Sequence, residues 1–373
     1  MVQKFNPESA YIHIPFCRGK CNYCSFVSGD YFDKKTGYLY SLLKEIDYYY
    51  SDEPLKTLYL GGGTPSCMDL EEIKKIVSKF RLEDNAEVTI EVNPNDVTPE
   101  YMNGLFDLGF NRVSMGAQSF DDNILKLIGR RHTSSEIYSA VENTRNAGFK
   151  NISLDLIYGL PTQTLKGFEH DLTEVINLDV EHISLYGLKI DEGCYFYKNP
   201  PTNLPDDDVQ ADMYIMAGEL TGKNGYEHYE VSNYSKSGYN SKHNSNYWEC
   251  KEYYGFGLAA HGYVDGVRYS NTSSIDEYLN SPVDREFGKF LTEKEKLEER
   301  IFLGLRLAKG INIDEINTDF NIDFRTKYKD VLNKYLKTGH LEETKIGYKL
   351  SDNPKTNGFL LSNVILADFM EDS

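Results

Sequence analysis

The chain is predicted to have an α/β fold in which parallel strands alternate with helices. Over the first two-thirds of its 373 residues, short apolar or β-branched runs alternate with segments whose apolar residues recur at helical spacing. Repeated β–α units of this kind favour parallel strands joined by right-handed crossovers. A hydrophobic content of 40% and a charged content of 26% are typical of a globular protein. Periodicity alone does not separate an open doubly wound sheet from a barrel.

The expected strands are short, and a helix is expected after each of them. Strands are expected at Ala10–Ile14, Thr57–Leu60, Glu87–Val92, Arg112–Ala117, Ile152–Tyr158 and His182–Leu188. Helices are expected at about Asp33–Tyr50, Asp69–Phe80, Pro99–Leu108, Ser134–Ala147, Leu165–Leu178 and Asp206–Leu220. Leu39, Leu42 and Ile46 fall on one face of the first helix. Thr98 followed by Pro99 is typical of a helix start, with an N-cap and proline at the first helical position.

A loop directly after the first expected strand carries three cysteines, Cys17, Cys21 and Cys24, in the spacing C-x3-C-x2-C. A structural zinc ion takes four ligands, and no fourth Cys or His follows within the loop. A [4Fe-4S] cluster normally takes four cysteines, so three would leave one iron open to a ligand from outside the protein. The spacing therefore favours an iron–sulfur cluster. The alternative is zinc with His13 as fourth ligand, although the ordinary role of His13 is that of a packed strand histidine.

Polar residues and glycines gather after several of the expected strands. In parallel α/β barrels, catalytic and binding residues lie at the C-terminal ends of the strands. Gly61–Pro65 follows the second strand, where glycines permit close approach by a ligand or form a tight turn. Glu91 ends the third strand, and Asp155 lies in an apolar run, where a buried acid needs a partner. The ordinary role of Arg130 would be a surface charge.

Together with the run Tyr-Ile-His-Ile-Pro-Phe-Cys at 11–17, the cysteine motif resembles that of radical S-adenosylmethionine (SAM) proteins. The subgroup it resembles contains the oxygen-independent coproporphyrinogen III oxidases and the HemW-type heme chaperones. The resemblance implies a partial (β/α)6 radical SAM barrel, with a [4Fe-4S] cluster on the three cysteines and SAM completing the open iron. It further implies that SAM or a neighbouring SAM-like site is contacted by Tyr11, Tyr23, Gly62, Gly63, Thr64, Glu91, Gln118, Arg130, Asp155 and Ile157.

A second motif, His243-Asn-Ser-Asn-Tyr-Trp248, holds the only tryptophan of the chain. A histidine next to aromatic rings could ligate heme iron and stack on a porphyrin, whereas a loop histidine packed on aromatic rings is the ordinary alternative. The pattern His-Asn-x-x-Tyr-Trp is similar to the motif that marks the heme chaperones. This resemblance implies heme contacts from His243, Asn244, Tyr247 and Trp248. Phe26 stands where the oxidase pattern, C-x3-C-x2-C-x-C, has a further cysteine.

The end of the chain is expected to form a small α+β, winged-helix-like domain that serves as a lid or docking domain. Its expected helices and strands are Leu291–Ala308, Phe324–Leu336, Tyr348–Leu350 and Phe359–Leu361. We expect three consecutive segments: the barrel with its cluster and SAM site at 1–225, a connecting region with the heme motif at 226–285, and the C-terminal domain at 286–373.

Composition excludes some partners. A net charge of −18 argues against a nucleic acid partner and disfavours attachment to anionic lipid. No apolar run approaches the ~20 residues needed to span a bilayer, and the N-terminus has no apolar signal-peptide core. Six cysteines in a chain of this length do not indicate a disulfide framework. A cytoplasmic location is therefore expected.

The expected function is that of a heme chaperone that binds heme, a [4Fe-4S] cluster and SAM and transfers heme to an acceptor protein. Contact with a membrane would follow only from an acceptor that is itself a membrane protein. The alternative is an oxygen-independent coproporphyrinogen III oxidase, which would cleave SAM to a radical and decarboxylate two propionates. The absent fourth cysteine at Phe26 and the complete His243–Trp248 motif favour the chaperone.

Overall fold

A computed structural model of the chain describes residues 7–371. It divides into two compact units, the first formed by 1–213 and 252–289 and the second by 214–251 and 290–373. The chain thus returns to the first unit after leaving it, which the three consecutive segments expected above do not anticipate. The assignment of the cluster and SAM site, the heme motif and the C-terminal domain to these three segments remains a prediction. Residues 1–6, which bear on the expected lack of a signal peptide, lie outside the described part.

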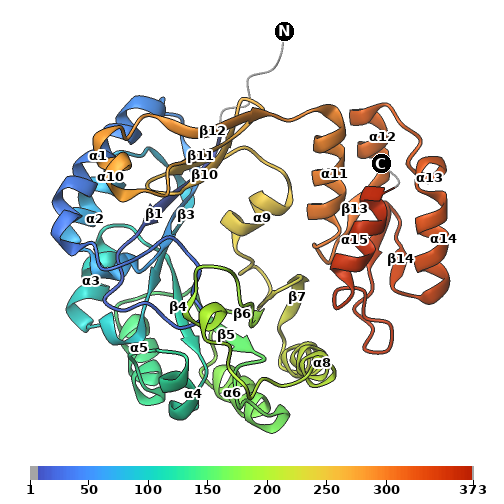
Figure 1. Ribbon diagram of the computed structural model, residues 1–373, viewed down its shortest axis with the longest axis horizontal. Coiled ribbons are helices and arrows are strands. Elements are labelled where there is room, and N and C mark those ends of the chain that lie inside the picture. Colours follow the sequence, from blue (N-terminus) through green and yellow to red (C-terminus); the bar gives the residue numbers. More distant parts are fainter. Residues whose placement is uncertain (1–6, 372–373) are drawn as a thin grey trace. The chain divides into compact units, whose positions relative to one another are not determined.

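The first unit is built on a parallel sheet whose first six strands lie side by side in sequence order, with a later strand added beside the first (Figure 1). Its strands are β1 Ser9–Ile14, β2 Leu55–Gly62, β3 Leu82–Val92, β4 Arg112–Gln118, β5 Ile152–Tyr158, β6 His182–Gly187 and β9 Tyr254–Phe256. Their order is β6-β5-β4-β3-β2-β1-β9, with every neighbouring pair parallel. A doubly wound sheet would reverse its order at a switch point. The unbroken order therefore confirms the partial (β/α)6 barrel.

Helices follow these strands, and most of those in the first unit lie outside the sheet (Figure 1). They are α1 Lys35–Tyr49, α2 Leu70–Val77, α3 Pro99–Asp107, α4 Asp122–Leu127, α5 Ser134–Asn146, α6 Leu165–Asn177, α7 Tyr195–Lys198 and α8 Asp207–Lys223, which runs into the second unit. The side chains of Leu39, Leu42 and Ile46 on α1 are buried, as predicted. Thr98 caps α3 by accepting a hydrogen bond from the Tyr101 amide.

Buried Glu45 on α1 holds the returning segment in the first unit. Its carboxylate accepts hydrogen bonds from the Gly257 amide (2.8 Å), the Asn271 side chain (2.7 Å) and the Tyr278 hydroxyl (2.6 Å). Burial raises the pKa of Glu45 to about 7. The returning segment comprises β9, β10 His261–Val264, β11 Val267–Asn271, α10 Ile275–Asn280 and β12 Arg285–Phe290. Strand β9 is only three residues long, and the sequence analysis missed it.

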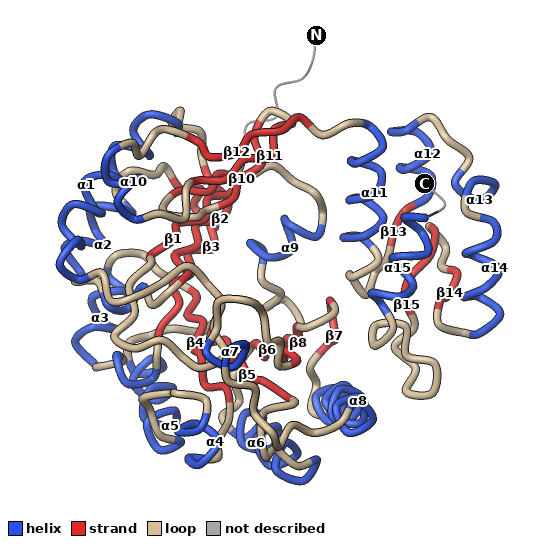
Figure 2. The backbone as a smooth tube through the Cα atoms, viewed as in Figure 1, coloured by secondary structure: helices blue, strands red, loops and turns tan. Residues whose placement is uncertain are grey.

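The second unit is an α+β module, as predicted, with short strands beside its helices (Figure 2). Its elements are β7 Glu227–Glu230, β8 Asn233–Ser235, α9 Lys242–Trp248, α11 Glu293–Gly304, β13 Ile311–Asn312, α12 Ile313–Phe320, α13 Phe324–Lys327, α14 Lys329–Thr338, β14 Leu341–Glu343, β15 Gly347–Leu350 and α15 Ser362–Glu371. Strands β13, β15 and β14 form an antiparallel sheet. The expected strand Phe359–Leu361 was wrong, because this short apolar run is a turn that leads into α15.

Strands β4 and β5 bury nearly all of their side chains. Parallel strands covered on both faces are expected to be apolar in this way. A ligand of the first unit would therefore meet polar groups mainly at the ends of its strands. None of the helices within residues 7–371 is both long and apolar enough to cross a lipid bilayer.

Candidate functional site

The loop after β1 carries the three cysteines, whose side chains are partly buried and form no disulfide. The Cys17 amide donates to the Gly29 carbonyl and the Gly29 amide donates to the Pro15 carbonyl, both at 2.9 Å. The Asn22 amide donates to the Ile128 carbonyl just after α4, also at 2.9 Å. The loop is thus held at its base and at its middle, which fixes its thiols beside the strand ends.

Two of the thiols have polar neighbours that come from other strand ends. Cys17 Sγ lies 3.5 Å from Thr64 Oγ1, and Arg130 donates a hydrogen bond to Cys21 Sγ at 3.6 Å. Burial raises the pKa of Cys24. No three His, Cys, Asp or Glu side chains within 7–371 are already grouped around a position for one metal ion. Three thiols on one loop nevertheless suit a cluster, in which each thiolate binds a different iron.

Arg130 and Asn93 join three strand ends beside this loop. Arg130 donates to the Gly116 carbonyl at 2.6 Å and to Asn93 Oδ1 at 2.7 Å, and Asn93 donates to Thr64 Oγ1 at 3.1 Å. The buried Nε of Arg130 has no hydrogen-bond partner in the described chain, so it can donate to an anionic group. These contacts rule out the ordinary surface role for Arg130. Asn93 was not singled out, although its place just after β3 is a signal that could have identified it.

The glycines after β2 pack closely against β1. A Cβ atom on Gly62, whose φ is +115°, would lie 2.6 Å from the His13 ring. A Cβ atom on Gly63 would lie 2.9 Å from the Ile14 carbonyl oxygen, and the Gly63 amide donates to that oxygen at 2.8 Å. The positive φ and the His13 ring account for Gly62, and close packing against the β1 backbone accounts for Gly63. Contact of either glycine with SAM stays a prediction.

We expect Gly62→Ala to lower the free energy of unfolding by about 1–3 kcal/mol. Alanine disfavours a positive φ, and its Cβ would press on the His13 ring. Gly222→Ala on α8 is the matched control, because a Cβ there meets no atom within 4 Å and alanine favours a helix. Urea unfolding of both variants measures the difference. Equal stabilities of the two variants would contradict this account of Gly62.

Glu91 is a buried carboxyl group that links β3 to β2. Its oxygens accept hydrogen bonds from the Tyr59 hydroxyl at 2.8 Å and from the Gly62 amide at 3.1 Å. Burial raises the pKa of Glu91 to about 7. Tyr59 was not among the predicted site residues, because only the folded sheet brings it beside Glu91.

The raised pKa of Glu91 predicts that its contribution to stability falls as pH rises. Between pH 4.5 and about 7 the unfolded chain ionises this group while the folded chain keeps it protonated, so folding takes up a proton. We expect the wild type to lose about 2–3 kcal/mol of stability relative to Glu91→Gln between pH 5 and pH 8. Glutamine fits, because its oxygen can accept from Gly62 and the Tyr59 hydroxyl can accept from its amide. Urea unfolding at both pH values tests this, and a pH-independent difference would refute it.

Asp155 on β5 lies among hydroxyl groups. Ser114 Oγ donates to its carboxylate at 3.4 Å, and Ser184 on β6 also bonds to it. Burial raises the pKa of Asp155, and the buried Arg112 guanidinium on β4 acts against this rise. The apolar run around Asp155 predicts a partner for this acid, and the two serines supply it. Arg112 was not predicted, because it lies at the start of β4 rather than at its end.

Gln118 ends β4 in a left-handed conformation, φ +70°, which is uncommon for a residue other than glycine. The register between β4 and β5 shifts between Gly116 and Gln118, which marks a bulge. A Cβ atom on Gly116 would lie 2.7 Å from Gln118 Nε2 and 3.2 Å from Arg130. Gln118 and Arg130 therefore lie over the same strand end. Backbone strain of this kind clusters at functional sites.

Tyr11 and His13 on β1 form a hydrogen-bonded pair. The Tyr11 hydroxyl donates to His13 Nδ1 at 3.1 Å, and His13 Nε2 donates to the Val27 carbonyl at 2.8 Å. Burial lowers the pKa of His13. Both ring nitrogens are thus engaged within the fold, so the ordinary role of His13 is confirmed and the zinc alternative loses its fourth ligand.

Tyr23 and Ile157 meet in one apolar cluster. The cluster is formed by Ile124, Leu125, Ile128, Ile157, Leu160, Cys194 and Phe196, with Tyr23 packed against it. Tyr23 thereby joins the cysteine loop to α4 and β5. Cys194 is a small, buried member of this cluster. Any contact of Tyr23 or Ile157 with SAM stays a prediction.

The His243–Trp248 motif lies in the second unit, where it forms most of α9 rather than a loop. The Ser241 hydroxyl caps this helix by accepting a hydrogen bond from the Asn244 amide at 3.3 Å. Asn244, Tyr247 and Trp248 are partly buried. The helix places residues that are three or four positions apart on a common side.

His243 and Tyr247 are one turn apart on α9 and are bonded to each other. His243 Nε2 and the Tyr247 hydroxyl form a hydrogen bond of 2.7 Å, and the His243 side chain is only 1% exposed. The Arg306 guanidinium lies 5.9 Å from the Trp248 ring and 4.2 Å from the Phe302 ring. The motif therefore combines an imidazole, a phenol and an indole beside a cation.

The contacts above join most of the predicted residues of the first unit into one site at the strand ends. Cys17 meets Thr64, Cys21 meets Arg130, Arg130 lies beside Gln118, and Glu91 bonds to Gly62. The heme motif belongs to the second unit and shares none of these contacts.

Two family models match this chain, one in its N-terminal half and one near its C-terminal end. The family model of the radical SAM superfamily matches residues 11–175, and that of the HemN C-terminal domain matches residues 291–353. The heme chaperone HemW of Lactococcus lactis subsp. lactis (strain IL1403) is 36% identical over 100% of this chain and 99% of its own length. This chain belongs to the HemW family of radical SAM proteins. Membership of the superfamily implies a [4Fe-4S] cluster and SAM as cofactors.

A second member of the HemW family is also similar over nearly its full length. The heme chaperone HemW of Bacillus subtilis (strain 168) is 34% identical over 97% of this chain and 99% of its own length. Among solved structures, the coproporphyrinogen III oxidase (HemN) of Escherichia coli matches with a TM-score of 0.85 at 21% identity, covering 98% of this chain and 90% of that one. That likeness shows the fold.

Proposed function

We propose that this protein is a heme chaperone that carries a [4Fe-4S] cluster and SAM and passes heme to an acceptor protein. The observation that carries the proposal is the full-length similarity to proteins named heme chaperone HemW. The complete His-Asn-x-x-Tyr-Trp motif on α9 supports it further. The acceptor is a heme protein, and contact with a membrane follows only if that acceptor lies in one.

Cys17, Cys21 and Cys24 are proposed to hold the cluster. Three thiolates leave one iron without a protein ligand, and the methionyl end of SAM is proposed to occupy it. Arg130 suits this position, because its charge lies beside Cys21 and its buried Nε has no partner in the described chain. When bound, a reduced cluster would supply the electron that cleaves SAM.

The remaining residues of the site are proposed to bind SAM through complementary chemistry. SAM carries an ammonium group, a carboxylate, a sulfonium and a ribose. Arg130 and Gln118 can donate to its carboxylate, and Glu91 and Asp155 can accept from its ammonium group or ribose hydroxyls. Gly62, Gly63 and Thr64 are proposed to lie along its methionyl end, while Tyr11, Tyr23 and Ile157 flank it.

His243, Asn244, Tyr247 and Trp248 are proposed to bind heme. Imidazole and phenolate are both known ligands of heme iron, and the indole of Trp248 can stack on a porphyrin. The hydrogen bond between His243 Nε2 and Tyr247 means that ligation through Nε2 must first release Tyr247.

The alternative is an oxygen-independent coproporphyrinogen III oxidase. The fold is shared with that enzyme, yet fold does not imply function. Phe26 stands at the position of the further cysteine in the oxidase pattern, and its side chain is 67% exposed. This departure disfavours the oxidase.

Two assays on the same purified, cluster-reconstituted protein test the proposal. In the first, heme-loaded protein is mixed with an apo heme protein, and heme is expected to move to the recipient. In the second, coproporphyrinogen III is supplied with SAM and a reductant, and no product is expected. Failure to bind heme, or formation of the decarboxylated product, would overturn the proposal.

A further inference from the structure

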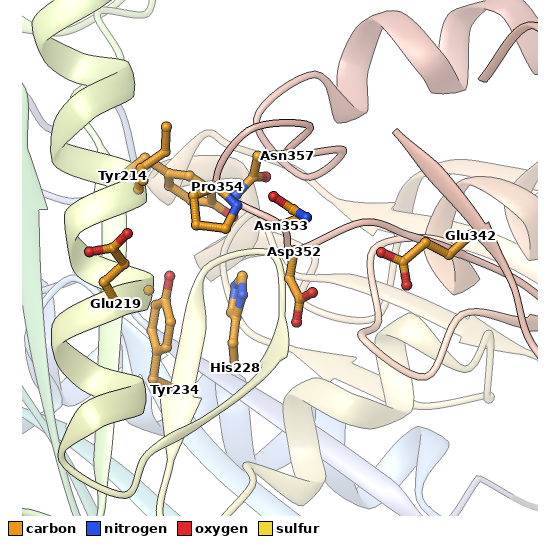
Figure 3. A pocket seen from close by; sticks show the side chains of 11 residues that line it. Tyr214, Glu219, His228, Tyr234, Glu342, Asp352, Asn353, Pro354 and Asn357 are labelled. Carbon is orange, nitrogen blue, oxygen red and sulfur yellow. The ribbon is translucent and has the colours of Figure 1, made fainter. Parts of the chain in front are cut away.

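A cavity of about 490 Å³ lies within the second unit, between α8 and the loop that follows β15 (Figure 3). None of its lining residues belongs to the cysteine loop or to the His243–Trp248 motif. The heme chaperone proposal therefore gives it no role, and the inference below does not depend on that proposal.

The cavity is lined by acidic groups. Glu219, Glu342 and Asp352 contribute carboxylates, and no lysine or arginine is among the lining residues. Glu219 and Glu342 each pair with a nearby lysine, at 3.7 Å and 3.2 Å. Asp352 makes no ion pair with another described residue, and its side chain is exposed. Its negative charge is therefore available to a ligand.

His228 supplies a second group without a partner. Its buried Nε2 has no hydrogen-bond partner among residues 7–371. Burial lowers the pKa of His228 to about 4, while a backbone hydrogen bond at Val231, the negative charge of Asp352 and a backbone hydrogen bond at Glu230 act in the opposite direction. Bonds that raise the pKa of an imidazole are those that its ring N–H donates. Since a neutral ring has one donor and one acceptor nitrogen, Nε2 is left as the acceptor.

Aromatic rings form one wall of the cavity. The His228 ring stacks on the Tyr234 ring, with centroids 4.3 Å apart and an angle of 12° between the planes. The Tyr214 ring meets His228 edge-on at 6.2 Å. Figure 3 shows the His228 ring between Tyr234 and Asp352. A flat cation can lie against such rings while it donates hydrogen bonds.

We propose that this cavity binds a cation with several N–H donors, a guanidinium or primary ammonium group, which Asp352 and His228 hold against the aromatic wall. Both available groups accept hydrogen bonds, so a ligand that donates them is favoured over an anion. The carboxylates and the imidazole of the cavity are not grouped around a position for one metal ion. An extended organic cation can reach acceptors that lie apart from one another, so it suits this cavity better than a metal ion does. Such a group could belong to a free amine or to a basic side chain of another protein.

Titration calorimetry of the full chain with N-acetylarginine amide and with agmatine tests the proposal. The neutral isostere N-acetylcitrulline amide is the ligand control. At least one cationic probe is expected to bind, with N-acetylcitrulline amide giving no binding. Tighter binding of N-acetylarginine amide identifies a basic side chain as the source, and tighter binding of agmatine identifies a free amine.

Asp352→Asn is expected to weaken binding by about tenfold, because it removes the available charge. Asp330→Asn on α14 is the matched control, since it removes an equally exposed aspartate charge outside the cavity, and it should bind as the wild type does. Glu219→Gln provides a second variant that is expected to weaken binding. Three results would each overturn the proposal. They are no binding of either cationic probe, equal affinity of the wild type and Asp352→Asn for the probes, and stoichiometric binding of Zn²⁺ or Mn²⁺ that Asp352→Asn abolishes.

Discussion

Cys21→Ser is expected to abolish the iron–sulfur cluster and to leave the fold intact. A serine hydroxyl is a poor replacement for a thiolate, and two remaining thiolates would leave two irons without protein ligands. The Cys21 side chain is only partly buried, so the substitution removes little packing. After anaerobic reconstitution, the wild type should hold about four irons and four sulfides per chain, and the variant fewer than one.

Cys250→Ser is the control for this experiment. Cys250 is also free and partly buried, but it belongs to the second unit. Its variant should hold the same iron and sulfide as the wild type. Two results would contradict the assignment: stoichiometric zinc in the wild type in place of iron, or equal loss of iron from both variants.

The parallel sheet could be predicted from the sequence because its strands are regular, apolar and separated by helices of ordinary length. All six expected strands of the barrel are present, within a few residues of their expected limits. Strand β9 could not be predicted in this way, since three residues carry no periodicity and its pairing with β1 is set by the returning segment. Phe359–Leu361 shows the opposite error, because this apolar run forms a turn in which only Phe359 is buried while Leu360 and Leu361 are exposed.

The sequence predicted site residues whose own position at a strand end suggests a role. It did not predict residues whose role depends on a hydrogen bond to a residue of another strand. Arg130 was assigned only through the resemblance to radical SAM proteins, whereas Glu91 stands out as a charged residue between apolar neighbours. Tyr59 and Asn93 do not, because their importance lies in hydrogen bonds to Glu91 and Arg130. Those hydrogen bonds depend on which strands pair and on the path of the loop after β4. The periodicity of apolar residues in a sequence predicts neither.

Helix α9 was missed for a different reason. Its sequence is rich in Asn, His and Ser, which have modest helix propensity. The cap at Ser241 and the surrounding unit nevertheless stabilise seven helical residues. The helix changes what the motif can do, since it sets His243 and Tyr247 one turn apart instead of leaving the histidine in a flexible loop.

His243→Ala is expected to weaken heme binding by at least tenfold, equivalent to about 1.4 kcal/mol or more. The substitution removes both a possible iron ligand and the partner of the Tyr247 hydroxyl. Titration of apoprotein with hemin, followed by absorption spectroscopy, gives the dissociation constant, and the position of the Soret band reports the ligand. His340→Ala is the matched control, because His340 is also in the second unit but outside α9, and it should leave affinity and spectrum unchanged.

Tyr247→Phe separates two ways in which the motif can hold iron. If His243 is the ligand, loss of the 2.7 Å hydrogen bond frees its Nε2, so hemin should bind at least as tightly and retain an imidazole spectrum. If the Tyr247 phenolate is the ligand, the variant should lose affinity and its spectrum should change. Either result keeps the heme site on α9. Wild-type affinity and spectra in both His243→Ala and Tyr247→Phe would instead remove these two residues from iron ligation, even in a protein that transfers heme.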